Sequence, residues 1–180
     1  MTVPAPRPTL REVQLADHAP AVVGLWRRNL RSAGREDLQA KLSLGYQHNP
    51  VGAGSGVLLH PDDAAEPAGV IGLHPRRLVF GARQFDVLNL ADFAVEPAFR
   101  TLGPALMLMK RALAVAGATG RFVYGLPNRN SAAVCKRAGL TQAGHLVRYA
   151  RVVGGSHPRM QTWPAPASAL ATLALALVDQ

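Results

Sequence analysis

The sequence predicts a mixed α/β fold in which a mostly antiparallel sheet is flanked by helices. Three observations predict it: apolar runs typical of strands fill the middle of the chain, segments with helical apolar spacing stand before and after them, and turn residues separate the segments. The 180 residues are 48% hydrophobic, which is enough for one well-buried domain.

The N-terminal third predicts one strand and two helices. TLREVQ at residues 9–14 has the character of a strand. Asp17 is expected to cap a helix that runs through APAVVGLWRRNL, with Pro20 in its first turn and apolar residues at helical spacing. A second helix is expected within residues 35–46.

The middle of the chain predicts three strands in a meander. They are GVLLH at residues 56–60, AGVIGLHPRRLVF at 68–80 and QFDVLNLADFAV at 84–95. A turn through PDDAAEP separates the first two strands, and a tight turn at GAR separates the second from the third. Strands joined by such short connections pair as antiparallel neighbours.

The last third predicts helices alternating with strands. We expect a helix from about residue 104 to 116, a strand at 121–126, a short helix at 130–139 that ends at Gly139, and a last strand at 146–153.

One domain is expected over residues 9–153, after a loose arm at 1–8 and before a linker and apolar helix at 154–180. The N-terminus has no apolar core of the signal-peptide type. The apolar stretch PAPASALATLALALV has roughly 15 residues, short of the roughly 20 that span a bilayer, so a packed or interfacial helix is expected and no membrane span. That helix also offers a contact for a homodimer.

The chain is strongly basic, with 20 Lys and Arg against 11 Asp and Glu and a formal net charge of +9. This charge favours an anionic partner: nucleic acid, a membrane surface or a phosphorylated cofactor. The arginine pairs at 27–28 and 76–77 lack interleaved aromatic residues, so we expect no nucleic-acid platform. They are either solvated or in contact with the cofactor's phosphate or an anionic acceptor.

The number and spacing of cysteines and histidines limit which disulfides and metal sites the chain can form. One cysteine excludes an internal disulfide and a cysteine-based zinc cluster, and it fits the cytoplasm. The six histidines show no i, i+4 pair, so no metal site is expected.

The hexad RTLGPA at residues 100–105 stands between a predicted strand and a predicted helix. Free N–H groups and the positive end of the helix dipole make an anion site there, and the small Gly103 and Ala105 let a pyrophosphate approach the backbone. Pro104 fits the first helical position, where its missing N–H costs nothing. The alternative is a plain turn with an unrelated arginine.

This hexad resembles the acyl-CoA motif of the GCN5-related N-acetyltransferase superfamily: Arg or Gln, two residues, Gly, one residue, then Gly or Ala. The preceding AVEP is similar to the family's ending of its central strand, and NRNSAAVCKRAGL resembles its second signature, with Asn128, Ser131 and Gly139 on the expected spacings. The resemblance covers roughly residues 10–153. It implies the acyl-CoA N-acyltransferase fold, with a splay between the two central strands.

The resemblance also implies a site for acetyl-CoA or another acyl-CoA as co-substrate. The strand edge would pair with the pantetheine arm, the amides at residues 102–105 would hold the pyrophosphate, and two polar side chains would touch the arm near the thioester. The cofactor-binding residues expected on this basis are Phe93, Ala94, Val95, Arg100, Thr101, Leu102, Gly103, Pro104, Ala105, Asn128 and Ser131.

Three residues are candidates for proton transfer. Cys135 stands where many relatives carry the Tyr that protonates the leaving thiolate, with inert packing as the alternative. Tyr124 is an equal substitute for that Tyr. Asp92 precedes Phe93 on the central strand and is a candidate base toward the acceptor amine, or else a partner for a neighbouring cation or amide.

Two functions remain open on this evidence. The first is an N-acyltransferase, most simply an N-acetyltransferase, that moves the acyl group to a small-molecule amine by direct attack. The second is a module that binds acyl-CoA without turnover, which the missing Tyr favours. The segment at residues 46–52 resembles one found in a subset of the superfamily, and this resemblance implies that it helps to roof the acceptor pocket, although Tyr46 by itself is typical of a core residue.

Overall fold

The computed structural model describes residues 8–30, 37–61 and 64–145. The chain forms two compact units, Met1–Gln142 and Ala143–Gln180, and every helix and strand described below belongs to the first. The predicted last strand at 146–153 and the apolar tail lie outside the described residues, and the predicted domain boundaries remain predictions.

The first unit holds a five-stranded sheet in the order β1-β2-β3-β4-β5. Its strands are β1 (Thr9–Gln14), β2 (Ser55–His60), β3 (Gly69–Phe80), β4 (Arg83–Val95) and β5 (Phe122–Gly125). All neighbours are antiparallel except β4 and β5, which are parallel. The mixed α/β sheet predicted from the sequence is confirmed.

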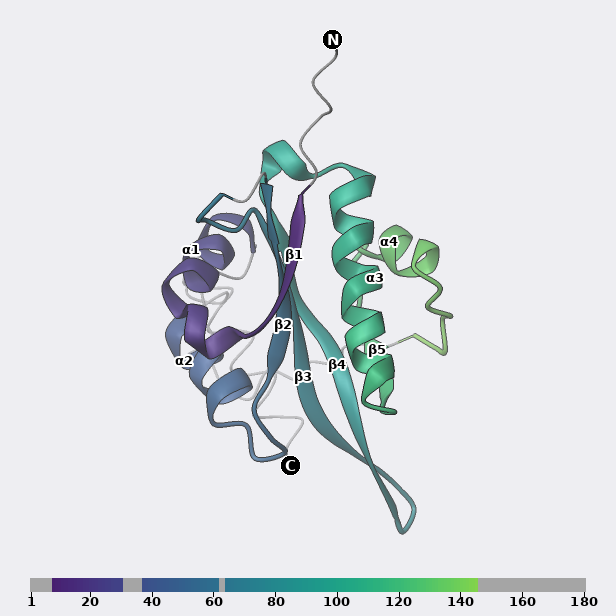
Figure 1. The fold of residues 1–180 in the computed structure, drawn as a ribbon. Coiled ribbons are helices and arrows are strands. Elements are labelled where there is room, and N and C mark those ends of the chain that lie inside the picture. Colours follow the sequence, from purple (N-terminus) through teal and green to yellow (C-terminus); the bar gives the residue numbers. More distant parts are fainter. Residues whose placement is uncertain (1–7, 31–36, 62–63, 146–180) are drawn as a thin grey trace, which may run out of the picture. The chain divides into compact units, whose positions relative to one another are not determined.

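Helices cover both faces of this sheet, as Figure 1 shows with the sheet nearly edge-on. α1 (Ala19–Asn29) and α2 (Leu38–Leu42), which runs on into a π-helical turn η2 (Ser43–Gln47), lie on one side. α3 (Leu102–Ala118) and α4 (Ala132–Arg137) lie on the other. Short 3-10 turns, η1 (Leu15–His18) and η4 (Pro97–Phe99), precede α1 and α3.

Each face has its own apolar core. The core beneath α1 and α2 is centred on Trp26 and Tyr46, both fully buried. The core beneath α3 and α4 is built from alternate residues of β2, β3 and β4 together with Leu108 and Ala112 of α3. The period-two alternation of the strands thus supplies both cores at once.

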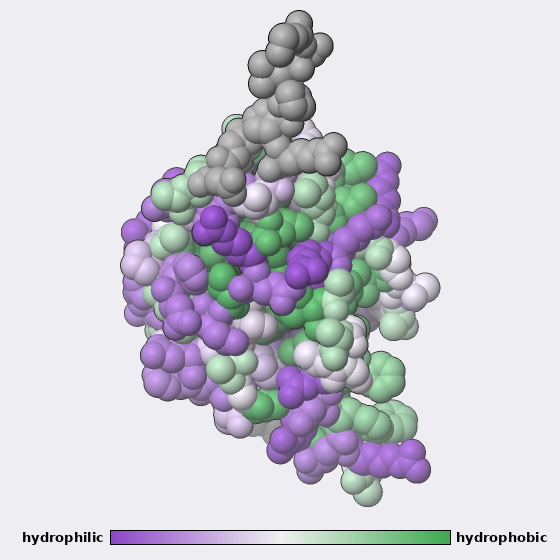
Figure 2. All heavy atoms as spheres, in the orientation of Figure 1, coloured by the Kyte–Doolittle hydropathy of each residue, from purple (hydrophilic) through white to green (hydrophobic). Residues whose placement is uncertain are grey.

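Hairpin β3–β4 continues past the end of the other strands and turns at Gly81, whose φ of +58° is one that glycine adopts without strain. Its end exposes apolar side chains, among them Val79 at 67% and Phe80 at 82%. Figure 2 shows hydrophobic and hydrophilic residues side by side at the lower end of the molecule, where this hairpin projects.

Two predictions about helix starts were wrong. Asp17 does not cap α1: it lies inside η1, and within the described residues the true N-cap, His18, makes no capping side-chain bond. Asp17 is part of the 3-10 turn that precedes the helix, so it does not stand at the N-cap position. α3 begins at Leu102 and not at Pro104, so the proline takes the third helical position, whose N–H also has no partner inside a helix.

Candidate functional site

Strand β4 loses its neighbour β5 halfway along its length. β5 pairs with residues 87–90 of β4, and no further rung is present in the part of the chain that the structure describes. The opposite edge of β4 stays paired with β3 up to Val95. The segment 91–95, which holds Phe93, Ala94 and Val95, is therefore paired with β3 except at residues 92–93, and its other edge is one that a strand-like ligand could use. This separation is the splay that the family resemblance implied.

A β-bulge in the β3–β4 pair lies close to the point where β5 separates from β4. The register between β3 and β4 shifts between Val70 and Gly72, and Asp92 takes a left-handed conformation with φ of 52°. A non-glycine residue in this region costs free energy and is found where the surrounding structure holds it in place. Here the indole Nε1 of Trp26 donates to the carbonyl of Asp92 at 3.2 Å. The bulge turns the Asp92 side chain toward α1 and α2.

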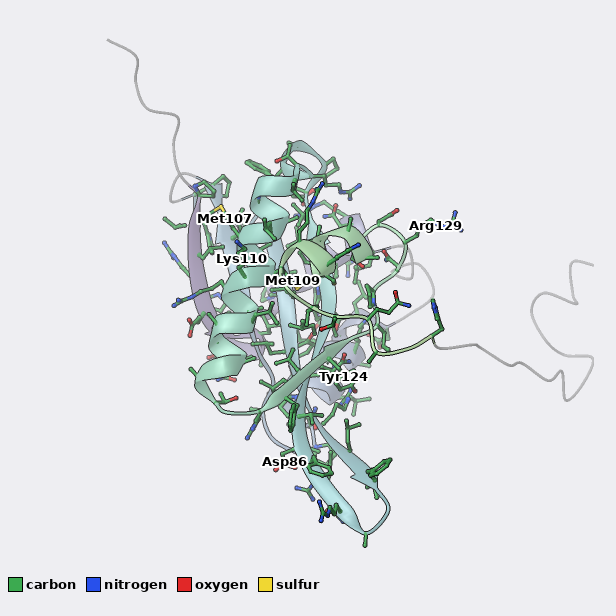
Figure 3. All side chains as sticks on the ribbon, turned by 90° about the vertical axis from the view of Figure 1, so that its right-hand side faces the viewer. Asp86, Met107, Met109, Lys110, Tyr124 and Arg129 are labelled. Atoms are coloured by element: carbon green, nitrogen blue, oxygen red, sulfur yellow. The ribbon has the colours of Figure 1, made fainter. Side chains whose placement is uncertain are left out.

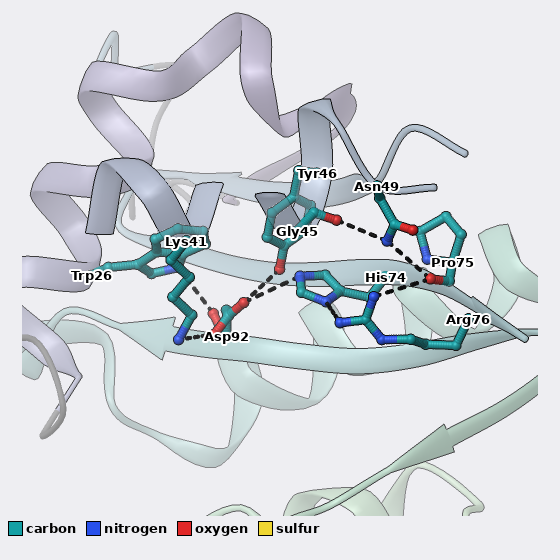
Figure 4. Close-up of polar contacts among 9 residues, drawn as sticks. All are labelled: Trp26, Lys41, Gly45, Tyr46, Asn49, His74, Pro75, Arg76 and Asp92. Carbon is teal, nitrogen blue, oxygen red and sulfur yellow. Dashed lines mark hydrogen bonds and ion pairs between the residues drawn. The ribbon is translucent and has the colours of Figure 1, made fainter. Parts of the chain in front are cut away.

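Asp92 is the centre of a cluster of polar side chains drawn from several elements (Figure 4). Its carboxylate accepts a hydrogen bond from the Tyr46 hydroxyl at 2.8 Å and pairs with the Lys41 ammonium at 2.6 Å. His74 Nε2 lies 3.5 Å from Oδ2. The Asp92 side chain is only 8% exposed, so this carboxylate is a buried anion with partners on several sides.

Opposing effects act on the two acids of this cluster. Burial favours the neutral form of Asp92, but the nearby His74 ring, the Lys41 ammonium and the Tyr46 hydroxyl favour the charged form and outweigh it, so the pKa of Asp92 lies below its ordinary value. Burial, together with the adjacent Asp92 charge, raises the pKa of Tyr46 well above its ordinary 10.0. Asp92 is therefore ionised and Tyr46 is a neutral donor at neutral pH.

The ring of His74 is held in one tautomer by geometry. Arg76 Nη2 lies 2.9 Å from His74 Nδ1, and a guanidinium can only donate, so Nδ1 must be the acceptor. The ring proton then sits on Nε2, which faces Asp92. The edge of the His74 ring packs against Tyr46 with centroids 4.1 Å apart, and a Cβ on Gly45 would lie 2.8 Å from the same ring.

A hollow of about 540 Å³ opens beside this cluster. Its lining comes from α2, η2 and β3 and consists of Asp37, Ala40, Lys41, Leu44, Gly45, His74 and Arg76. Asp37 is the N-cap of α2, and its carboxylate accepts from the amides of Gln39 and Ala40. The lining thus exposes more apolar than polar surface, but it carries side chains of both charges and includes Lys41 and His74, the neighbours of the buried Asp92.

Asn89 continues the polar face of the sheet next to the hollow. It pairs with His74 on β3 and with Tyr124 on β5, and paired residues of neighbouring strands point to the same face. Its Oδ1 is buried and has no hydrogen-bond partner among the described residues. The Tyr124 hydroxyl likewise makes no described hydrogen bond, and Figure 3 places Tyr124 midway along the sheet, above the hairpin. These groups are available to a ligand at the splay.

The start of α3 offers main-chain donors. The amide of Thr101 bonds to the Phe99 carbonyl, whereas those of Leu102 and Gly103 make no backbone bond in the described structure, as expected for the first turn of a helix. A Cβ placed on Gly103 would have nothing within 4 Å in the part of the chain described. The cradle expected for a pyrophosphate is therefore open, although Ala105, as the fourth helical residue, has its amide inside the helix.

The guanidinium of Arg100 does not extend into this cradle. Its Nε donates to the Val95 carbonyl at 2.8 Å, and Nη2 donates to the Asn29 side chain at 2.5 Å. Arg100 thus ties the end of β4 to α1 and fixes where α3 begins. A contact between its side chain and a phosphate stays a prediction.

The second signature folds onto itself. The Asn128 side chain accepts from the amides of Asn130 and Ser131, and the Ser131 hydroxyl donates back to Asn128. Cys135 is 9% exposed and packs in the core beneath α3, where burial raises the pKa of its thiol. Packing, the simpler of the two predicted roles for Cys135, fits these surroundings.

Two acidic residues near Asp92 take no part in the cluster. Asp86 lies on the projecting hairpin, as Figure 3 shows, and pairs with the exposed Arg77. Glu96 pairs with Arg28 at 2.8 Å; burial opposes this charge but the Arg28 hydrogen bond prevails and lowers the pKa of Glu96. Only Asp92 among these acids is buried beside the hollow.

Sequence reasoning missed the partners of Asp92. Lys41 and Tyr46 come from the continuous stretch α2–η2, and His74 comes from β3, about 30 residues further along the chain. Of the three, only Tyr46 lies in a segment that the sequence analysis singled out, and there it is read as a core residue. One signal was available: the glycines at 45 and 72 are the positions where any Cβ would strike the His74 ring or the Tyr46 hydroxyl. Within the described residues, no group of three or more His, Cys, Asp or Glu is placed to hold a metal ion. Nor is any described helix long and apolar enough to cross a membrane.

No protein-family model and no curated protein matches the chain. Solved structures do match. An aminoglycoside N-acetyltransferase AAC(6')-Iy in complex with CoA aligns with a TM-score of 0.63 at 18% identity, over 83% of this chain and 99% of that one. A GCN5-related N-acetyltransferase from Ralstonia eutropha JMP134 aligns with a TM-score of 0.59 at 17% identity, over 80% and 99%. A GNAT family N-acetyltransferase from Escherichia coli in complex with CoA aligns with a TM-score of 0.59 at 23% identity, over 77% and 71%.

The described sheet is mixed, its parallel strands β4 and β5 separate beyond residue 90, and α3 begins just after β4. The chain has the fold of the GCN5-related N-acetyltransferases. The resemblance seen in the sequence is confirmed at the level of the fold.

Proposed function

We propose that the protein is an acyl-CoA-dependent N-acyltransferase, most simply an N-acetyltransferase acting on a small-molecule amine in the cytoplasm. One observation carries the proposal: the open edge of β4 runs directly into a helix start with unpaired amides and no side chain over Gly103. A pantetheine arm needs strand-like hydrogen bonding, and a pyrophosphate needs main-chain donors. In this chain a free strand edge is followed directly by a helix start with unpaired amides, and solved structures of the same fold are in complex with CoA.

Phe93, Ala94 and Val95 would hold the amide-rich arm of the co-substrate. The amides of Leu102 and Gly103 would bind its pyrophosphate, with Thr101, Pro104 and Ala105 shaping the turn. Asn128 and Ser131 would lie beside the arm near the thioester. Acyl-CoA supplies the activated carbonyl, and the protein's part is to orient it toward the hollow.

The acceptor amine would enter from the hollow on the other side of the splay. Its nitrogen bonds to the thioester carbonyl carbon, a main-chain N–H near Phe93 stabilises the oxyanion, and the C–S bond then breaks. We assign the proton for the leaving thiolate to Tyr124, because its phenol is half-buried at the splay and makes no hydrogen bond within the described residues. Cys135, in an apolar core, is assigned a packing role.

For Asp92 we propose positioning and not direct proton abstraction. A carboxylate with several donors and a lowered pKa is a weak base, whereas its charge keeps Lys41, Tyr46 and His74 in fixed places. Asn89 Oδ1, buried and unpartnered among the described residues, would accept a hydrogen bond from the attacking amine. The amine proton would leave through water in the hollow.

The competing function is a module that binds acyl-CoA without turnover, which the buried Cys135 at the position of the usual acid favours. Isothermal titration with acetyl-CoA tests the shared part: stoichiometric binding is expected from both functions. A thiol-release assay against a panel of primary amines then separates them. If acetyl-CoA binds but no amine causes release of CoA, the protein is the binding module and not the enzyme. If acetyl-CoA does not bind at all, both functions are refuted.

A further inference from the structure

We infer that the hollow selects amine acceptors that also carry an oxyanion, a carboxylate or a phosphate, and that Arg76 binds this group. The inference rests on the proposed acyl transfer and adds the chemical class of its acceptor. It starts from the position of Arg76, which follows His74 by two residues on β3 and therefore points to the same face of the sheet, into the hollow.

Arg76 differs in its surroundings from Lys41, the other cation in the lining of the hollow. Lys41 is paired with Asp92 at 2.6 Å, and the Asp37 carboxylate caps the first amides of α2. No carboxylate lies within ion-pair distance of Arg76 in the part of the chain that the structure describes. A half-buried guanidinium in this state attracts an anion from solution.

The guanidinium is also held in place before any ligand arrives. Nη2 lies 2.9 Å from His74 Nδ1, and the weaker contact of Nη1 with the Pro75 carbonyl is 3.4 Å long. His74 itself is fixed between Tyr46 and the backbone of Gly45. Arginine has more N–H donors than these two contacts use, so the remaining fork can bind an oxyanion bidentately with little loss of side-chain freedom.

The register sets the spacing between the two ends of such an acceptor. Asn89, the proposed partner of the amine, is opposite His74, two residues along β3 from Arg76. Two residues of a strand span about 7 Å. The acceptor is therefore expected to carry its oxyanion several bonds away from the reacting nitrogen, as in an ω-amino acid or an amino sugar phosphate, and a neutral or purely cationic amine is expected to be poor.

The test compares amines that differ only in the oxyanion. The probes are glucosamine 6-phosphate against glucosamine, and 6-aminohexanoate against 6-aminohexanamide. Binding is measured by calorimetry with and without CoA, and kcat/KM by thiol release. The intact protein is expected to prefer the anionic member of at least one pair by tenfold or more, and Arg76→Gln to remove most of that preference, with Arg76→Lys retaining part of it.

Arg77→Gln is the matched control, because it removes the same charge from the next position, on the opposite face of β3, where Arg77 pairs with Asp86. It should leave the preference unchanged. Equal treatment of both members of both pairs by the intact protein, or a preference that survives Arg76→Gln in a variant with an unchanged thermal midpoint, overturns the inference. Because acceptor binding is read without turnover, a protein that binds the anionic probes but releases no CoA would refute the proposed reaction and leave the Arg76 site standing.

Discussion

The two halves of the candidate site are built by opposite means. The start of α3 is made of main chain and of a glycine with open space beside it, from residues adjacent in the sequence. The Asp92 cluster is made of side chains that arrive from α1, α2, η2, β3 and β4 and fill the space between them. Among the described residues, the first half has main-chain donors without backbone partners, whereas the second half pairs most of its polar groups with one another.

This difference assigns different work to each half. Unpaired amides at a helix start bind an anion with little reorganisation, so in the proposed function the α3 start contributes affinity for the co-substrate. A buried carboxylate with several donors is costly to disturb, so the Asp92 cluster contributes rigidity to the wall of the hollow. Substitutions in the two halves should therefore separate, with ligand binding affected in one and stability in the other.

Asp92→Ala is expected to have the largest effect. It leaves the Lys41 ammonium and the Tyr46 hydroxyl without their partner and places alanine in a left-handed conformation, so the free energy of unfolding should fall by about 3–5 kcal/mol. Urea denaturation measures it. Asp86→Ala, which breaks an exposed ion pair, is the control and should cost about 1 kcal/mol or less. Similar losses in the two variants would mean that the cluster adds no rigidity.

Gly103→Val comes next. The new side chain meets no described atom and so should leave the fold intact, but it covers the amides proposed for the pyrophosphate. Loss of two charge-assisted hydrogen bonds, about 3 kcal/mol, corresponds to binding of acetyl-CoA weakened roughly 100-fold. Gly117→Val makes the same change in the same helix, again with open space beside it, and should bind normally in the same titration. Unchanged binding by Gly103→Val would place the cradle elsewhere.

Tyr124→Phe and Cys135→Ser form the third pair. Removing a general acid typically slows the chemical step by about 100-fold or more, so thiol release by Tyr124→Phe should fall by that factor with acetyl-CoA affinity retained. Cys135→Ser keeps a proton donor of similar size in the core and should stay within a few-fold of the parent rate. The reverse result would return the acid role to Cys135 and bring the cofactor's thioester close to α4.

The smallest expected effect is a pH dependence. The folded-state pKa of Asp92 lies below its ordinary value of 3.8, so the stability that its ionised form contributes is complete above that value and is lost as the pH falls through the folded-state pKa. The difference in unfolding free energy between the parent and Asp92→Asn should therefore be constant near neutrality and shrink below pH 3.8. A difference that persists undiminished in acid would show that the charge of Asp92 contributes nothing.

Local sequence patterns correctly predicted the features that depend on residues adjacent in the sequence. The strands at β1 to β5, the turn at Gly81 and the open helix start after β4 all follow from apolar periodicity, turn residues and a short motif. The structure differed from the predicted helix starts at two places. Asp17 lies in a 3-10 turn and not at the N-cap of α1, and α3 begins at Leu102, before the proline. Both differences lie at element boundaries, where several caps have similar free energies.

By itself, then, the sequence determined the order of elements and the helix start after β4 whose amides are proposed to hold the pyrophosphate, because both depend on residues close together along the chain. Only the tertiary structure decided that Asp92 is the hub of Lys41, Tyr46 and His74, and that Arg100 bonds to Val95 and Asn29. It also decided that Arg76 has no carboxylate within ion-pair distance among the described residues. The reason is physical: hydrogen bonds and charge pairs form between whichever groups packing brings within about 3–4 Å, and their separation along the chain places no limit on that.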